Sequence, residues 1–189
     1  QAPAEQMPPE QVEPAPDQEP VQPEQEAGNN YVFRLNQTGD SFLGIQLSVQ
    51  IPLNVKNLYV GGAGGIMFSR YVTDYFALGG ELDFSYETTV GSNVFYFIPV
   101  MVKGTFDIPV GKFEFSAALA VGFVFQSYIN RNYYGLIVKP ELGAFYRFSP
   151  TWSIGVTAAA NIIPQWYTIS ANNRTGVILS TGACVRFHF

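Results

Sequence analysis

The end of the chain alternates apolar side chains with polar or small ones, and this alternation constrains the fold more than any other feature. In residues 183–189 an alanine, a valine and two phenylalanines recur at every second position, which places them on one face of a β-strand. An exposed apolar edge strand makes a water-soluble protein aggregate, whereas a strand that closes a barrel in lipid leaves no free edge. The sequence therefore predicts a transmembrane β-barrel whose last strand ends at Phe189.

Composition divides the chain into two unlike parts. Residues 1–26 hold seven prolines, six glutamines and seven acidic residues, with no basic or aromatic residue. All ten Lys and Arg residues lie downstream, where only eight acidic residues oppose them. The segment has too few apolar side chains for their burial to offset the loss of chain entropy on folding. We therefore expect residues 1–30 to be a disordered, partly polyproline-like tail. This tail is either an inert spacer or a docking strip for another envelope or periplasmic protein.

The rest of the chain repeats the same period-2 alternation in eight segments, each long enough for a tilted strand that spans a bilayer. These segments are residues 42–53, 58–72, 75–88, 94–108, 113–127, 133–148, 152–163 and 174–189. Large apolar residues share one face, and charged or small residues share the other, which is the inverse of a soluble barrel with an apolar interior. We predict an all-β fold, an eight-stranded antiparallel transmembrane barrel over residues 41–189, with a short connecting segment at 31–40.

The links between these segments predict an orientation in the membrane. An even number of strands places both termini on the same side, so we expect the termini and the tight turns near 73–74, 109–112 and 149–151 to face the periplasm. Aromatic residues near the strand ends are expected to form two girdles at the membrane surfaces. The periplasmic girdle comprises Tyr71, Tyr75, Phe76, Phe113, Phe148, Trp152 and Phe189, and the outer girdle includes Phe95, Tyr96, Trp166 and Tyr167.

The chain resembles the small eight-stranded bacterial outer-membrane β-barrel superfamily, which includes the OmpA, OmpX and OmpW types. The resemblance rests on the strand count, the alternation, short turns such as residues 71–78, and the terminal Phe189. The resemblance implies an integral place in the outer membrane, in contact with membrane lipid and lipopolysaccharide. It also implies that the barrel-insertion machinery reads the C-terminal signature Val185, Phe187 and Phe189.

The inward face of the predicted strands carries nearly balanced charges. The acidic members are Glu81, Asp83, Asp107, Glu114 and Glu141, and the basic members are Lys103, Lys139, Arg147 and Arg186. The interior of an eight-stranded barrel is just wide enough for side chains, and an unpaired buried charge costs several kcal/mol. We therefore expect an ion-pair network that plugs the lumen, as in a structural or anchor protein of the envelope.

Two alternatives to a plugged barrel stay open. The first is a narrow channel whose charged pairs rearrange to form a polar path. The second is a carrier of small apolar molecules, as OmpW-type barrels are thought to be. Its support is the inward position of Ile137, Phe145, Ile163 and Ile178.

Other sites have little support in the sequence. His188 is the only histidine and lies about 13 Å along its strand from Cys184, so neither a Cys/His nucleophile pair nor a metal cluster is predicted. We expect no enzymatic activity and no cofactor, and the acidic tail argues against nucleic-acid binding. The outer connections carry the basic residues Lys56, Arg131 and Arg174, and few acidic residues besides Glu87. These three are candidates for lipopolysaccharide phosphate contacts, and ordinary solvated rim charge explains them equally well.

Overall fold

A computed structural model describes residues 36–54, 58–89, 94–128, 131–165 and 174–189 of the chain. The chain divides into two units, residues 1–32 and 33–189, and the described residues all lie in the second unit. The expected tail, the first part of the connecting segment, and Trp166 and Tyr167 lie outside the described residues. In the ranges that are described, no helix is long and apolar enough to cross a membrane.

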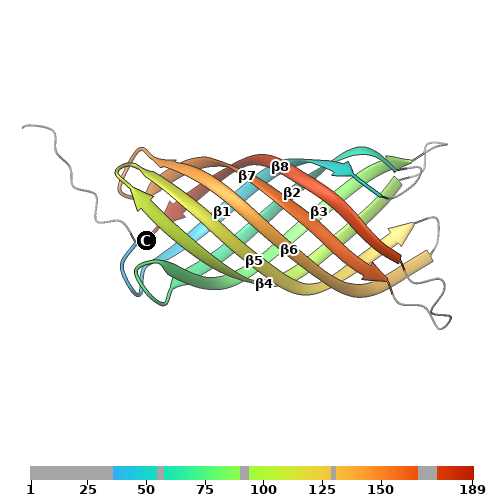
Figure 1. The fold of residues 1–189 in the computed structure, drawn as a ribbon, viewed down its shortest axis with the longest axis horizontal. Coiled ribbons are helices and arrows are strands. Elements are labelled where there is room, and N and C mark those ends of the chain that lie inside the picture. The colour runs from blue at the N-terminus through green and yellow to red at the C-terminus, as the bar shows by residue number, and fades with distance from the viewer. Residues whose placement is uncertain (1–35, 55–57, 90–93, 129–130, 166–173) are drawn as a thin grey trace, which may run out of the picture. The chain divides into compact units, whose positions relative to one another are not determined.

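Eight strands form a closed antiparallel barrel (Figure 1). They are β1 (Ser41–Pro52), β2 (Leu58–Tyr71), β3 (Phe76–Thr89), β4 (Val94–Val110), β5 (Phe113–Tyr128), β6 (Arg131–Arg147), β7 (Trp152–Gln165) and β8 (Arg174–His188). Each strand pairs with its neighbours in sequence, and β1 pairs with β8 from Phe42 opposite His188 to Pro52 opposite Ile178. Every strand end lies within two residues of its predicted position, and the predicted eight-stranded antiparallel barrel is confirmed.

The three short turns lie at the end of the barrel where β1 begins and β8 ends. Residues 72–75, 111–112 and 148–151 join β2 to β3, β4 to β5 and β6 to β7. The turn after β4 depends on Gly111, whose φ of 63° favours glycine. Figure 1 places the C-terminus at this end, on the left. We call it the turn end, and the opposite end the loop end.

The barrel is apolar outside and charged inside. On the outer face Leu47 is 69 % exposed and Phe123 is 73 % exposed, whereas the inward Lys103 is 1 % exposed. In water such an outer surface would expose far more contiguous apolar area than a soluble monomer carries. A surrounding bilayer satisfies it, because lipid wets the apolar face and the closed sheet leaves no free edge. The strands are therefore of the transmembrane type.

Two members of the expected aromatic girdles face inward instead. Tyr71 is 1 % exposed, and half-buried Phe95 packs against apolar side chains inside the barrel. Tyr71 ends the glycine-rich strand β2, where the sequence offered little contrast between the two faces. The outer surface at the turn end does carry an aromatic row: the ring centroid of Phe187 is 4.9 Å from that of Trp152 and 5.7 Å from that of Phe189.

Candidate functional site in the barrel lumen

All nine charged residues assigned to the lumen point into it. They are Glu81, Asp83, Lys103, Asp107, Glu114, Lys139, Glu141, Arg147 and Arg186. None is more than 5 % exposed, and each takes part in at least one ion pair. The structure divides them into two clusters, and no ion pair joins these clusters among the described residues. Strand parity identified the luminal residues, but it did not indicate which of them form ion pairs with one another.

The middle cluster consists of five charged residues on β3, β4 and β6. Lys103 Nζ lies 2.8 Å from Glu81 Oε2 and 2.7 Å from Glu141 Oε1. Lys139 Nζ pairs with Glu81 Oε1 and lies 2.8 Å from Asp83 Oδ2. A further contact of 3.7 Å joins Lys139 to Glu141. Three carboxylates thus share two ammonium groups, which ties the three strands together across the lumen.

An amide donates hydrogen bonds to two of the carboxylates in the middle cluster, which has one more acid than bases. Gln46 on β1 is 4 % exposed and donates from Nε2 to Glu81 Oε1 at 3.3 Å and to Asp83 Oδ1 at 3.2 Å. The glycine-rich strand β2 makes room for this contact, because a Cβ atom on Gly65 would overlap the carboxylate of Asp83. Gln46 was not predicted as a member of the cluster, although its inward parity is visible in the sequence.

The turn-end cluster consists of Asp107, Glu114, Arg147 and Arg186. Arg186 Nη1 lies 2.7 Å from Glu114 Oε1 and 3.5 Å from Asp107 Oδ1. Arg147 Nη2 lies 3.9 Å from Glu114 Oε2. Tyr71 donates its hydroxyl hydrogen to Asp107 Oδ2 at 2.7 Å, so its burial is explained by a partner inside the lumen. Two acids face two guanidinium groups, and the charges of this cluster balance.

An aromatic layer closes the inner side of the turn-end cluster. The Arg186 guanidinium carbon lies 3.5 Å from the ring centroid of Phe145 and 4.8 Å from that of Phe42, which is cation–π geometry. Phe145 reaches this position because Gly143 and Gly155 carry no side chain. A Cβ atom on Gly143 would lie 2.7 Å from Phe145 Cε2. Phe145 therefore belongs to the turn half of the lumen, apart from the isoleucines with which it was grouped.

Three further residues complete the turn-end cluster, and the sequence did not single them out as luminal contacts. Asn36 donates from Nδ2 to Glu114 Oε2 at 2.7 Å and accepts from Arg147 Nη2 at 2.9 Å. Arg147 Nη2 also lies 2.7 Å from His188 Nδ1, and Ser153 Oγ lies 2.9 Å from His188 Nε2. A serine–histidine hydrolase needs a carboxylate at the second ring nitrogen. Here a guanidinium occupies that place, so these contacts serve packing and polar satisfaction.

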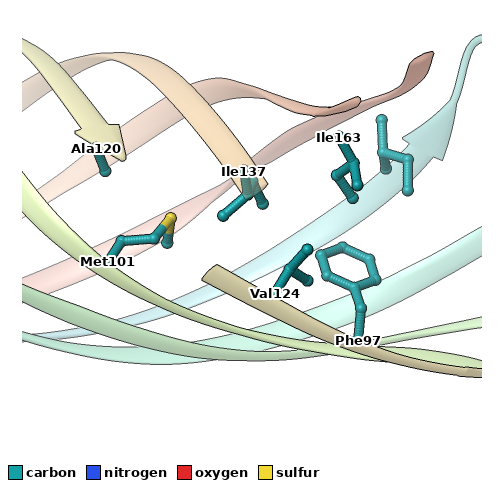
Figure 2. Close-up of a cluster of buried hydrophobic side chains, with 7 residues drawn as sticks. Phe97, Met101, Ala120, Val124, Ile137 and Ile163 are labelled. Atoms are coloured by element: carbon teal, nitrogen blue, oxygen red, sulfur yellow. The ribbon is translucent and has the colours of Figure 1, made fainter. Parts of the chain in front are cut away.

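The loop half of the lumen holds an apolar layer. Its members are Phe97, Met101, Ala120, Val124, Ile137, Ile163 and Ile178. Figure 2 shows Phe97, Val124, Ile137 and Ile163 gathered between strands inside the barrel. Three of the four inward apolar residues noted in the sequence, Ile137, Ile163 and Ile178, thus lie in one cluster. Large side chains fill this section of the lumen.

The sequence grouped Glu87 with the outer connections, and this placement is wrong. The residue lies within β3, opposite Gly61 and Phe95, and its side chain is fully buried. Neither carboxylate oxygen has a hydrogen-bond partner among the described residues. A Cβ atom on Gly61 would lie 2.8 Å from Glu87 Cγ, so here too a glycine of β2 makes room for an inward carboxylate.

The expected lipopolysaccharide contacts can be placed only in part. Arg174 begins β8 at the loop end and is exposed. Arg131 begins β6, and its side chain lies outside the described residues, as does the whole of Lys56. The C-terminal signature residues Val185, Phe187 and Phe189 face outward, and the backbone of Phe189 pairs with that of Ser41 at 2.8 and 2.9 Å.

Comparison with known sequences places most of the chain in one family. A protein-family model that carries no functional description matches residues 19–187. An uncharacterized protein of Treponema pallidum (strain Nichols) is 30 % identical over 68 % of this chain and 59 % of its own length. A second uncharacterized protein of that strain is 24 % identical over 70 % of this chain and 51 % of its own length. The chain therefore spans only about half to three-fifths of the length of these relatives.

Solved structures with the same fold are small outer-membrane barrels. Neisserial surface protein A superposes with a TM-score of 0.64, at 12 % identity, over 80 % of this chain and 99 % of its own. OprG from Pseudomonas aeruginosa gives 0.53, at 8 % identity, over 82 % and 97 %. Ail of Yersinia pestis, in complex with the heparin analogue sucrose octasulfate, gives 0.55, at 9 % identity, over 81 % and 100 %. The chain has the fold of the eight-stranded outer-membrane barrels, which confirms the resemblance drawn from its sequence.

Proposed function

The chain belongs to the family whose model matches residues 19–187, and on that premise we propose that it is an integral outer-membrane barrel with a closed lumen. Its role is that of a structural or interaction protein, an anchor in the bacterial envelope, and it is not catalytic. The N-terminal tail is the part proposed to reach a partner in the periplasm, and the barrel holds the tail at the membrane.

The observation that supports a closed lumen is the filling of the barrel along its length. The turn-end cluster, the aromatic layer, the middle cluster and the apolar layer follow one another from the turn end toward the loop end. An ion moving through must displace several buried pairs, and breaking one buried pair costs about 3–5 kcal/mol. A structural role needs only this stability, whereas a permanently open pore needs a continuous wet path.

Single-channel conductance in a planar bilayer tests the closed lumen. The wild type is compared with Lys103→Ala, which removes one centre of the middle cluster, and with Arg70→Gln, which alters an exposed arginine on the outer face of β2. Heat-shifted gel mobility verifies that each protein is folded. We expect silence from the wild type and from Arg70→Gln. Steady, discrete openings of the wild type that change in Lys103→Ala would show that the lumen conducts and would overturn the proposal.

A second candidate function is the transport of small apolar molecules. The observation that favours it is the apolar layer, where Ile137, Ile163 and Ile178 meet Phe97 in the loop half of the lumen. Native mass spectrometry of the purified barrel tests this candidate. A bound hydrophobic ligand that is lost when Ile163 is changed to Gln would favour a carrier. Its absence after incubation with fatty acids and alkanes would leave the apolar layer as a dry plug.

The orientation and the outer contacts belong to the same proposal. The start of β1 and the end of β8 pair at the turn end, and we assign this end of the barrel to the periplasm. The loop end, with Lys56, Arg131 and Arg174, then faces the lipopolysaccharide phosphates. The sulfated ligand seen with Ail supports anion contacts for this fold. Protease treatment of intact cells carrying an epitope after residue 28 tests the orientation, because a periplasmic epitope is cut only after the outer membrane is permeabilised.

A further inference from the structure

The segment just before β1 enters the turn end of the barrel. We call residues 36–40 the strap. Asn36, its first described residue, is 2 % exposed and has a φ of 45°, a left-handed conformation that asparagine tolerates better than most residues. The backbone therefore turns sharply where the amide side chain enters the lumen. No strand-strand pairing holds this residue in place, so its position depends on the few contacts of the strap itself.

The strap is fixed at two levels. At the rim, the Thr38 backbone N–H and hydroxyl both donate to Asp74 Oδ1, at 3.1 and 2.9 Å, in the exposed turn between β2 and β3. Nearby, Gly39 N–H donates to the Tyr71 carbonyl and Tyr71 N–H donates to the Asp40 carbonyl, each at 2.8 Å. The two Thr38 bonds are exposed, so they compete with water and contribute little net stability. These two bonds therefore position the strap at the rim without locking it.

Inside, the amide of Asn36 bridges Glu114 and Arg147. Those two groups are 3.9 Å apart, and Asn36 donates to one at 2.7 Å and accepts from the other at 2.9 Å. Both groups keep partners on the strands when Asn36 leaves. Glu114 still has Arg186 at 2.7 Å, and Arg147 still has the His188 ring at 2.7 Å. Removing the strap exposes this cluster to water without leaving an uncompensated buried charge.

We propose that the strap is a releasable latch that closes the turn-end mouth of the lumen and couples this mouth to the chain upstream of residue 36. When the upstream chain is drawn away from the barrel, Asn36 leaves and water reaches Glu114 and Arg147. The opening stops at the aromatic layer, because Arg186 is held between Phe42 and Phe145. The latch thus controls a charged vestibule, and it does so whether or not the barrel conducts.

Thiol labelling of the full chain tests the latch. Ser153→Cys places a reporter in the vestibule, where Ser153 is 2 % exposed. The native Cys184 is also buried, clusters with Phe42 and Phe145, and reports loosening of the barrel as a whole. A charged methanethiosulfonate reagent is added to the folded protein, and mass spectrometry follows each thiol. Ser116→Cys, at another buried position of the turn half, repeats the measurement if Ser153→Cys folds poorly.

Two asparagine variants are expected to differ in their labelling rates. Asn36→Ala removes two hydrogen bonds to the cluster, so we expect labelling at position 153 to rise roughly tenfold. Asn54→Ala also removes two amide hydrogen bonds, but these are exposed bonds to backbone groups near the other end of β1, to Thr175 O at 2.7 Å and from Val177 N at 2.8 Å, and the labelling rate should not change. Equal rates in wild type and Asn36→Ala overturn the proposal. Faster labelling of Cys184 as well also overturns it, because the strap would then be part of the barrel fold.

Coupling to the upstream chain is tested by pulling. In force spectroscopy from residue 1 of the bilayer-embedded protein, we expect a first, low-force rupture that releases chain as far as residue 40, ahead of the ruptures of the strands. Asn36→Ala should weaken or abolish this first event, and Asn54→Ala should retain it. Traces whose first rupture already releases a strand would contradict the coupling.

Discussion

At the scale of single residues, the buried charges of this barrel differ in whether a partner compensates their desolvation. Glu114 is 2 % exposed and has Arg186, Arg147 and Asn36 around it. Glu87 is fully buried, and its oxygens have no hydrogen-bond partner in the described part of the chain. A buried polar group without a partner loses its hydration and gains nothing in return. From the described contacts we expect Glu87 to weaken the fold at its site and Glu114 to support the cluster around it.

Glu87→Gln and Glu114→Gln should for this reason change stability in opposite directions. Replacing the Glu87 carboxylate by an amide of similar shape lowers the desolvation cost, so we expect a gain of about 1–2 kcal/mol. The same change at Glu114 leaves Arg147 and Arg186 with only Asp107 as acid, and we expect a loss of about 3 kcal/mol. The measurement is the urea midpoint of the heat-shifted gel band. A loss of stability in Glu87→Gln would show that this carboxylate has a compensating partner.

At the scale of strands, alternation in the sequence was enough to predict the fold and the membership of the lumen. It placed every strand end within two residues and put nine charged residues on the inward face, because a period of 2 fixes the face of each side chain. It could not predict pairing, because partners such as Lys139 and Asp83 lie 56 residues apart. Tyr71 was misplaced because it ends the weakly contrasting strand β2. Glu87 was misplaced because it lies near the loop end of β3, although its parity continues that of Glu81 and Asp83. Asn36 was missed because it lies outside any strand.

The close packing of β6 against β7 gives a prediction at this scale. A Cβ atom on Gly155 would overlap the Ala144 carbonyl oxygen and lie 2.5 Å from Phe145 Cδ1, so Gly155→Ala should displace both the β6 backbone and the ring and cost about 1–3 kcal/mol. Gly80→Ala is the matched control, because its Cβ would meet only the Met101 carbonyl at 3.7 Å. Urea midpoints measured side by side check this expectation. Equal midpoints for the two variants would mean that both the β6 backbone and the Phe145 ring shift freely, and that Phe145 does not hold Arg186 in place.

At the scale of the whole molecule, the described chain reaches the barrel through one short segment, residues 36–40. Among the described residues, contacts with the barrel from outside its strands and turns begin at Asn36. The sheet closes through β1 and β8 with eleven residue pairs, and none of them involves the tail. Closure of the barrel therefore rests on the strands themselves, and we expect the stability of the barrel to depend on its strands and its luminal clusters.

Deleting residues 1–28 should accordingly leave the folded barrel intact. The truncated chain keeps the strap and every described contact, so its urea midpoint should match that of the full chain within about 0.5 kcal/mol. Deleting residues 1–40 is the comparison, because it also removes Asn36. We expect that variant to retain its heat-shifted band and to label rapidly at a cysteine in place of Ser153. If deletion of residues 1–28 abolishes the heat-shifted band, the tail takes part in folding, and its proposed role as a separable spacer or docking strip is wrong.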